Sequence, residues 1–367
     1  MSLNRAILLT PPGPGAIAVV RLVGPGVSAF LAAHFSRPPA VGRCVHGALR
    51  DDGKVLDDPV VVLGPGGAWT DLNLHGGPWV VRSALELARR DGFDVVEGDL
   101  PLDAIDGEDA IERETAAHLP RARTELALAA LLAQPAAWAA ARALPWDEVR
   151  AVARRALDDA ALDNLLRLPR VAIVGPANAG KSTLANQLFA EARSITADAP
   201  GTTRDWVGEV ANVDGLAVML VDTPGLRATA DAIERAAIAA ATTEAEGADL
   251  VVLVLDAARP LDPDQRPLLA RYPHAVRVVN KSDVPRAWRE AVPDAIDTVA
   301  TTGGGVDAIR RAVAAHFGCA DLDVQRPRAW TDRQRAILRS AIDRPEALAR
   351  LWEDAAGDPR AAITSSA

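Results

Sequence analysis

A glycine-rich loop between an apolar run and a helical segment is the feature that most constrains how this chain can fold. The run Val171–Val174 is short and mostly β-branched, which is typical of a buried parallel strand. It leads into Gly175-x-x-x-x-Gly180-Lys181-Ser182, the full P-loop pattern. Backbone N–H groups of such a loop wrap phosphates, and the N-terminus of the following helix adds its dipole. The sequence therefore predicts a nucleotide-binding α/β domain.

Three further elements follow the P-loop in the order that a GTP-binding domain requires. Thr202-Thr203-Arg204-Asp205 lies in a turn-rich loop, where one threonine would complete Mg²⁺ coordination beside a γ-phosphate. Asp222-Thr223-Pro224-Gly225 closes an apolar strand and predicts the second metal and γ-phosphate contact. Asn280-Lys281-Ser282-Asp283 ends another strand, and its aspartate would accept from N1–H and the 2-amino group of guanine. Adenine offers no such pair of donors, so the motif predicts guanine specificity.

These elements together define the predicted site. We expect Lys181 to contact the β- and γ-phosphates and Ser182 to ligate Mg²⁺, together with Thr203 and, through water, Asp222. The apolar runs predict a doubly wound, mostly parallel sheet over residues 168–318. The residues expected to bind GTP are Asn178, Ala179, Gly180, Lys181, Ser182, Thr183, Thr202, Thr203, Asp222, Thr223, Pro224, Gly225, Asn280, Lys281, Asp283 and Ala300.

Composition narrows the setting of this domain. The 367 residues carry a net charge of −9, which argues against bulk non-specific binding to nucleic acid but allows a local basic patch. Cys44 and Cys319 are far apart and are expected to be ordinary structural thiols. The apolar run before the first prolines is too short for a secretory signal, and no stretch reaches the roughly 18 residues of a membrane span. We therefore expect a cytoplasmic protein.

Lysine is rare in this chain. Only Lys54, Lys181 and Lys281 occur among 40 basic residues, and two of them lie inside the nucleotide-binding motifs. A compact ammonium group can be required where a planar guanidinium does not fit.

The motifs "GPANAGKSTL", "PGTTRD", "DTPGLR" and "NKSD" resemble those of the tRNA-modification GTPase family MnmE, also called TrmE. The opening "TPPGPGAIAVVRLVGPG" and the segment "LHGGPWVVRSALELA" resemble the N-terminal part of the same family. The resemblance implies a multidomain α/β chain with an α+β, folate-binding-like domain at 1–104 that forms a homodimer. A helical part at 105–167, a P-loop GTPase domain at 168–318 and a returning helical segment at 319–367 would follow. The helical part is expected to hold three or four short helices, divided by its prolines.

The resemblance also implies how water is activated. In Ras-type GTPases a glutamine shortly after the Asp-x-x-Gly element orients the attacking water, but this chain has Leu226 there. In the MnmE family a glutamate of the following helix takes this role, which would be Glu234, and K⁺ supplies the charge of an arginine finger. The residues at the corresponding K⁺ positions are Asn178, Ala197, Ala199 and Thr202. From the residues alone, Asn178 as a loop brace and Glu234 as a solvated helix residue remain alternatives.

Two departures from the family concern its tRNA chemistry. Family members end in a tail resembling Phe-Cys-Ile-Gly-Lys, whereas this sequence ends "GDPRAAITSSA", so a shortened member is expected. The family's folate-contacting lysine has no counterpart, although Arg21 matches a folate-contacting arginine and Asp71 stands where the family has glutamate. Arg21 can equally be a salt-bridge residue, and His75 in "HGGP" is more typical of a structural turn than of catalysis.

Two functions therefore remain open. The first is a K⁺-stimulated GTPase that serves wobble-uridine modification of tRNA, with GTP, Mg²⁺, K⁺ and a folate one-carbon donor. Its partners would be a flavin-dependent, MnmG-type subunit and tRNA, with no membrane. The second is a reduced paralogue that keeps the GTP switch and acts as a regulator or scaffold without modifying tRNA.

Overall fold

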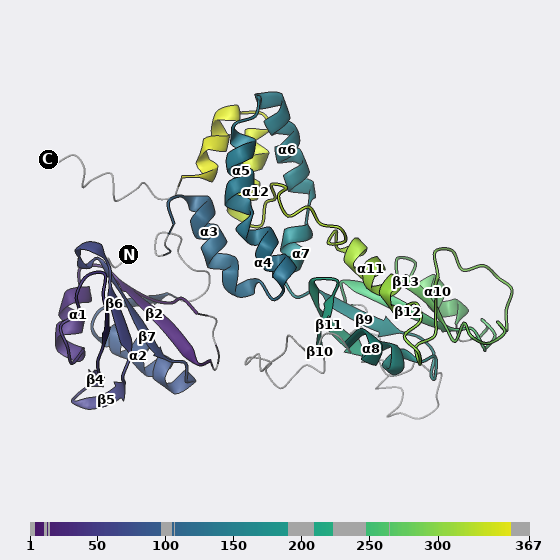
Figure 1. Ribbon diagram of the computed structural model, residues 1–367, viewed down its shortest axis with the longest axis horizontal. Coiled ribbons are helices and arrows are strands. Elements are labelled where there is room, and N and C mark those ends of the chain that lie inside the picture. The colour runs from purple at the N-terminus through teal and green to yellow at the C-terminus, as the bar shows by residue number, and fades with distance from the viewer. Residues whose placement is uncertain are drawn as a thin grey trace. The chain divides into compact units, whose positions relative to one another are not determined.

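The computed structural model describes residues 4–10, 13, 15–96, 105, 107–189, 209–222, 247–263 and 265–353. The chain divides into two compact units, coloured along the sequence in Figure 1. Of the described residues, the first unit contains those up to Pro120 with Trp352 and Glu353, and the second contains those from Arg121 to Leu351. Among the described residues, the second unit thus holds the P-loop and the Asn280-Lys281-Ser282-Asp283 motif together with helices from both sides of them in the sequence. The division into four domains predicted from the sequence stays a prediction.

The first unit is built on a six-stranded sheet of order β3-β6-β7-β2-β1-β8. Neighbouring strands are antiparallel, except that β1 and β8 are parallel. Strands β4 and β5 form a separate hairpin. The elements are β1 (Arg5–Leu8), β2 (Ile17–Val23), α1 (Val27–His34), β3 (Cys44–His46), β4 (Leu49–Asp51), β5 (Lys54–Asp57), β6 (Val60–Leu63), β7 (Trp69–His75), α2 (Pro78–Arg90), β8 (Asp94–Val96) and α3 (Ala110–His118).

Alternation along β2 explains how this sheet builds its core. Ala18, Val20 and Leu22 are buried, and Val20 and Leu22 join Phe30 of α1 and Leu87 of α2 in one apolar cluster. Side chains two apart on a strand point to the same face, so the "IAVVRLV" sequence directs every second residue to the helices. Burial of such apolar surface is the main favourable term in folding the unit.

The helical part of the second unit contains α4 (Glu125–Leu132), α5 (Gln134–Arg142), α6 (Trp146–Asp158), α7 (Ala161–Leu166) and α12 (Asp332–Ala341). Residues 105–167 thus contain five described α-helices, α3 to α7, whereas three or four were expected from the prolines. The additional break falls at Asp159, whose carboxylate accepts from the backbone N–H of Ala161 at 2.9 Å and starts α7 without a proline or glycine. Across the described residues, no helix has the length and apolarity that crossing a membrane would demand.

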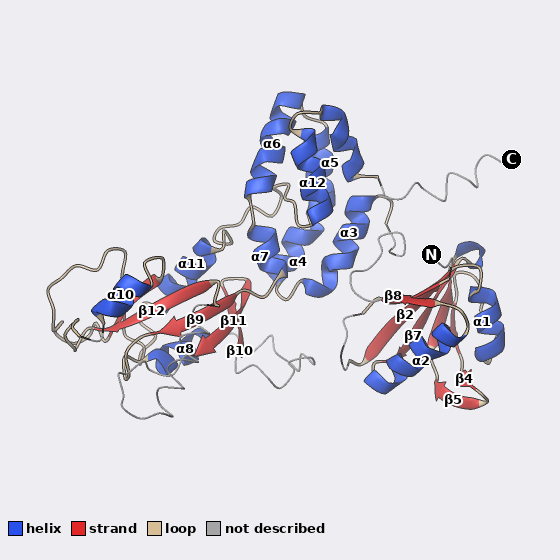
Figure 2. Ribbon diagram, turned by 180° about the vertical axis from the view of Figure 1, so that it is seen from behind, coloured by secondary structure: helices blue, strands red, loops and turns tan. Residues whose placement is uncertain are grey.

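The remaining part of the second unit is a six-stranded sheet of order β10-β11-β9-β12-β13-β14, red in Figure 2. All neighbouring strands are parallel except the β10–β11 pair. Helices α8, α10 and α11 pack on this sheet, as the doubly wound pattern predicted. The elements are β9 (Arg170–Val174), α8 (Lys181–Phe189), β10 (Glu209–Val213), β11 (Leu216–Asp222), β12 (Leu250–Asp256), α10 (Arg266–Arg271), β13 (Val276–Asn280), β14 (Ile296–Thr298) and α11 (Val306–His316).

Both cysteines are free thiols, and Cys44 is exposed whereas Cys319 is buried. Burial raises the pKa of the Cys319 thiol to about 11, which keeps it protonated at neutral pH.

A buried glutamine joins the two sequence segments of the helical part. Gln134, at the start of α5, is fully buried, and its amide donates to the Arg326 carbonyl at 3.2 Å and accepts from the Arg328 N–H at 2.7 Å. The Trp138 indole donates to the Arg328 carbonyl at 2.9 Å, and the Arg328 guanidinium donates to Asp159 at 2.9 Å. The chain that returns after the GTPase motifs is therefore fixed by two buried and two partly buried hydrogen bonds.

We predict that Gln134→Leu lowers the free energy of unfolding by about 1–3 kcal/mol, because the buried Arg328 N–H loses its acceptor. The measurement is the urea midpoint followed by far-UV circular dichroism. Gln325→Leu is the matched control, since Gln325 is exposed in the same returning segment. Equal midpoints for the two variants would contradict the role given to Gln134.

Candidate functional site

The ends of five parallel strands meet at one edge of the second sheet, where the described nucleotide motifs lie. Asp222 closes β11 beside Ile173 of β9, directly before the P-loop. Asp256 closes β12 opposite Asn280 of β13, and Asn280 in turn pairs with Thr298 of β14. Carboxyl ends of parallel strands are where doubly wound sheets bind ligands.

The P-loop follows β9 and requires glycine at two close approaches. A Cβ on Gly175 would lie 2.3 Å from the Val254 carbonyl oxygen. Gly180 has φ of +92°, and a Cβ there would lie 2.2 Å from Nδ2 of Asn280. The intervening Asn178 is exposed and has φ of +64°, a conformation that asparagine tolerates better than most residues. The two glycines of the motif thus let the P-loop pack against β12 and β13.

Four consecutive backbone carbonyls of the P-loop each accept a hydrogen bond from a side chain. A trans peptide places its C=O and N–H on opposite sides, so a carbonyl held outward turns the next N–H toward the hollow of the loop. Successive N–H groups arranged in this way form an anion-binding nest. The pairs are Lys181 Nζ with Pro176 O (3.0 Å), Arg259 Nη1 with Ala177 O (3.2 Å), Lys281 Nζ with Asn178 O (2.8 Å) and Asn280 Nδ2 with Ala179 O (2.8 Å).

A buried carboxylate holds one of these donors in place. Oδ2 of Asp256 lies 2.6 Å from Nζ of Lys281, and the Asp256 side chain is 1% exposed. Its Oδ1 accepts from the Ala258 N–H at 2.9 Å, so both carboxylate oxygens are satisfied. Asp256 was not predicted from the sequence as a site residue. An aspartate that ends an otherwise apolar strand at the ligand-binding edge was the available signal.

The guanine-recognition motif is fixed by its asparagine. Oδ1 of Asn280 accepts from the Ala300 N–H at 2.9 Å and from the Thr298 hydroxyl at 3.3 Å. Asn280 therefore ties the P-loop, the end of β14 and the following loop to one side chain. The carboxylate of Asp283 stays exposed, as a group that awaits a base would be.

The structure thus brings Asn178, Ala179, Gly180, Lys181, Asn280, Lys281 and Ala300 together through direct contacts. Ser182 and Thr183 lie in the first turn of α8, and Asp222 is placed by its strand. The other predicted residues lie outside the described part of the chain, namely Ala197, Ala199, Thr202, Thr203, Thr223, Pro224, Gly225 and Glu234.

Comparison with known proteins agrees with this geometry. The family described as 50S ribosome-binding GTPase matches residues 170–281. The tRNA modification GTPase MnmE of Chloroflexus aurantiacus is 30% identical over 364 residues, which cover 84% of this chain and 80% of that protein. MnmE of Thermus thermophilus is 30% identical over 410 residues, covering 97% of this chain and 93% of that protein. The chain belongs to the MnmE family of tRNA modification GTPases.

Among solved structures, Aquifex aeolicus Era bound to GDP and AlF4⁻ covers 43% of this chain and 58% of its own, with 24% identity. Its TM-score of 0.32 is too low to support an argument about function.

In this MnmE-family chain the two predicted folate residues bind each other. Arg21 of β2 and Asp71 of β7 are opposite in register, and their side chains form two hydrogen bonds of 2.7 Å. The Arg21 guanidinium also lies 4.2 Å from the centre of the Trp69 ring, a cation–π contact. Arg21 is 5% exposed. The salt-bridge alternative therefore describes the geometry of this pair.

His75 ends β7, and both its side chain and its backbone N–H form hydrogen bonds with the buried Asp57. Its Nδ1 lies 2.7 Å from Oδ1 of Asp57, and its backbone N–H donates to Oδ2 at 2.9 Å. The hydrogen bond to the Asp57 carboxylate and the charge of that carboxylate raise the pKa of His75 above its ordinary value. These hydrogen bonds fit the structural role expected for a histidine beside two glycines. Asp57, Asp58 and His75 lie close enough together to hold a metal ion, and two of the three, Asp58 and His75, are exposed.

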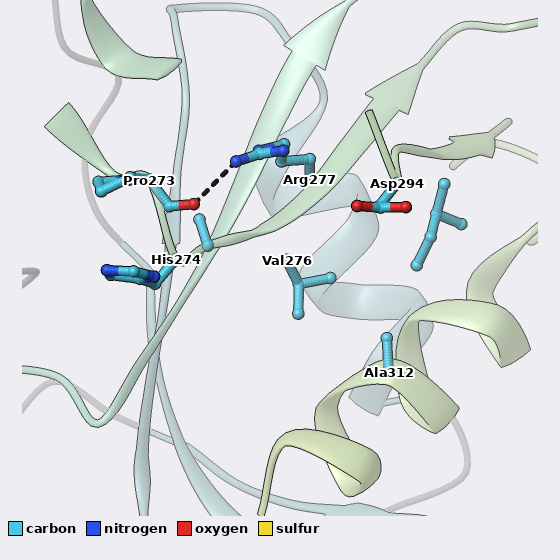
Figure 3. Close-up of a pocket in the computed structure, with 8 residues that line it drawn as sticks. Pro273, His274, Val276, Arg277, Asp294 and Ala312 are labelled. Carbon is cyan, nitrogen blue, oxygen red and sulfur yellow. Dashed lines mark hydrogen bonds between the residues drawn. The ribbon is translucent and has the colours of Figure 1, made fainter. Parts of the chain in front are cut away.

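A cavity of about 310 Å³ lies at the opposite end of β13 from the guanine motif, and Figure 3 shows its lining. The guanidinium of Arg277 donates to the Pro273 carbonyl at 2.7 Å across its rim. Because Val276 and Ile296 begin their strands here, this cavity is separate from the ligand-binding edge.

We predict that Asp256→Asn weakens GDP binding by about 1 kcal/mol, roughly fivefold in Kd. Asparagine can still accept from Ala258, but it turns an N–H₂ donor toward the Lys281 ammonium and displaces it from the Asn178 carbonyl. The measurement is titration with a fluorescent GDP analogue. Asp262→Asn is the control, because Asp262 forms an exposed ion pair with Arg266 in the same loop and should leave Kd unchanged. An unaltered Kd for Asp256→Asn would refute this role.

Proposed function

We propose that this chain hydrolyses GTP with Mg²⁺, that K⁺ stimulates the hydrolysis, and that the reaction serves wobble-uridine modification of tRNA. The observation that carries the proposal is the P-loop beside the guanine motif, whose Ala177, Asn178 and Ala179 carbonyls each accept from a side chain outside the loop. Family membership supports the same conclusion, since the matched relatives are tRNA modification GTPases over most of their length. We further propose the four-domain division predicted from the sequence, and a homodimer through the N-terminal domain.

Each predicted side chain has a role in this proposal. Lys181 leaves the Pro176 carbonyl to contact the β- and γ-phosphates, and Ser182, Thr203 and Asp222 hold Mg²⁺, the last through water. Asp283 accepts from the guanine base, and the Lys281 stem lies along it. Glu234 orients the attacking water in place of the glutamine that Leu226 replaces.

K⁺ would supply positive charge where negative charge develops between the β- and γ-phosphates. We assign Asn178 as its side-chain ligand and Ala197, Ala199 and Thr202 as ligands from the switch loop. Two observations support Asn178 in particular. Its side chain is exposed at the tip of the P-loop, and its backbone is already fixed by Lys281.

A reduced paralogue without tRNA-modifying activity is the second candidate. The Arg21–Asp71 pair favours it, because two residues expected to contact folate use their charges on each other. In that case the GTP switch would act as a regulator or scaffold, without the folate donor or the MnmG-type partner.

We predict that turnover is at least about threefold faster in KCl than in NaCl at equal ionic strength, because a correctly held cation stabilises the transition-state charge. Asn178→Gly should abolish this difference while leaving GDP affinity largely intact. Glycine is the matched substitution, since φ of +64° strains other side chains but not glycine. Phosphate release under single-turnover conditions is the measurement. Equal wild-type rates in the two salts would count against the K⁺ mechanism.

We predict that this chain restores wobble-uridine modification in a bacterial strain that lacks its own MnmE. Mass spectrometry of tRNA nucleosides is the readout, and Lys181→Ala is the control because it removes the phosphate-binding ammonium. Normal GTP hydrolysis by the purified chain without restored modification would favour the paralogue instead.

A further inference from the structure

Arg259 contacts the P-loop from outside every recognised motif. It follows β12 by three residues, is exposed, and donates from Nη1 to the Ala177 carbonyl at 3.2 Å. Within the described part of the chain, no carboxylate competes for its guanidinium, so this carbonyl is its side-chain partner. An exposed arginine without an ion pair normally stays in solvent, and the P-loop contact therefore needs a cause.

The backbone that carries Arg259 is fixed by a buried glutamine. Gln265 is 1% exposed, and its Oε1 accepts from the Asp256 N–H at 2.7 Å. Its Nε2 lies within hydrogen-bond distance of the Asp256 carbonyl (3.2 Å), the Arg259 carbonyl (3.1 Å) and the Pro260 carbonyl (3.0 Å). One side chain thus closes the whole turn from Asp256 to Pro260. Arg259 is presented to the P-loop by a rigid base.

The contact acts on one particular peptide unit. The Ala177 carbonyl and the Asn178 N–H belong to the same plane and point in opposite directions. With the carbonyl held by Arg259, the Asn178 N–H is turned toward the hollow where the phosphates bind. Asn280 holds the Ala179 carbonyl in the same way, which orients the Gly180 N–H, whereas the Ala179 N–H donates to the Pro176 carbonyl at 3.3 Å. Arg259 and Asn280 thus orient the donors on either side of Ala179.

We propose that Arg259 is a positioning residue for GTP hydrolysis that acts through the Ala177–Asn178 peptide. The assignment rests on the proposed GTPase function. Donors aimed in advance at developing charge accelerate hydrolysis because they need no reorganisation during the reaction. Arg259 binds a carbonyl, which faces away from the anion nest, so it orients the donor and does not itself contact GTP.

The test compares Arg259→Met, which keeps the aliphatic stem, with Arg259→Lys, which keeps a cation. We expect Arg259→Met to lower kcat about threefold to tenfold, less than the hundredfold or greater loss when such a donor is removed outright. KM for GTP, Kd for GDP and the melting temperature should stay within experimental error of wild type. Arg259→Lys should recover part of the lost kcat. Arg289→Met is the control, since Arg289 is an exposed arginine of the same domain and should behave as wild type.

Two results would overturn the assignment. A wild-type kcat for Arg259→Met would show that the Ala177–Asn178 peptide needs no tie. Parallel losses of kcat, GDP affinity and melting temperature would make Arg259 a structural brace of the loop. If the wild-type chain itself does not hydrolyse GTP, the proposed function fails and the assignment fails with it. Normal hydrolysis by both the wild type and Arg259→Met would instead overturn the assignment alone.

Discussion

The hydrogen bonds from side chains to the P-loop carbonyls are the constraint on which the nucleotide site depends. Phosphate binding by a P-loop needs N–H groups that converge, and peptide groups converge only when their carbonyls have partners on the other side. In this chain the partners of the Ala177, Asn178 and Ala179 carbonyls come from the loop after β12 and from Asn280 and Lys281 at the end of β13. The sheet register that sets Asp256 beside Asn280 is therefore part of the phosphate site.

The Lys281 ammonium beside the P-loop is paired with the buried Asp256 carboxylate. The Lys281 ammonium alone would bring a cation to the loop at the cost of its own desolvation. The buried Asp256 carboxylate offsets this cost and leaves the pair close to neutral, and Lys281 also binds the Asn178 carbonyl. Arg259 differs because it is exposed and needs no buried counter-ion.

The sequence predicted the second sheet and the motifs at the ends of β9 and β13 because their signals are local. A P-loop is contiguous, and apolar runs that end in aspartate or asparagine indicate buried parallel strands. Asp256, Arg259 and Gln265 escaped prediction because each acts through contacts made only after β9, β12 and β13 pair. The helix boundary at Asp159 was missed for a related reason. It depends on a hydrogen bond from the Ala161 N–H to the Asp159 carboxylate, and no proline or glycine marks it in the sequence. In the first unit, the sequence left Arg21 undecided, and the register of β2 against β7 sets it opposite Asp71.

Lys181 and Lys281 lie at two places where an ammonium group fits, although arginine is the common basic residue of this chain. Lys281 Nζ binds the Asp256 carboxylate at 2.6 Å and the Asn178 carbonyl at 2.8 Å, so one nitrogen serves two acceptors. A tetrahedral ammonium can donate in both directions from a single atom, whereas a planar guanidinium spreads its donors over a wider fork. Lys181 donates at 3.0 Å to a carbonyl five residues earlier in its own loop, a similarly confined place. Arg259 has space at the rim of the loop, where the wider group fits. Lysine therefore binds the carbonyls where space is confined, and arginine binds the Ala177 carbonyl, where its side chain is exposed.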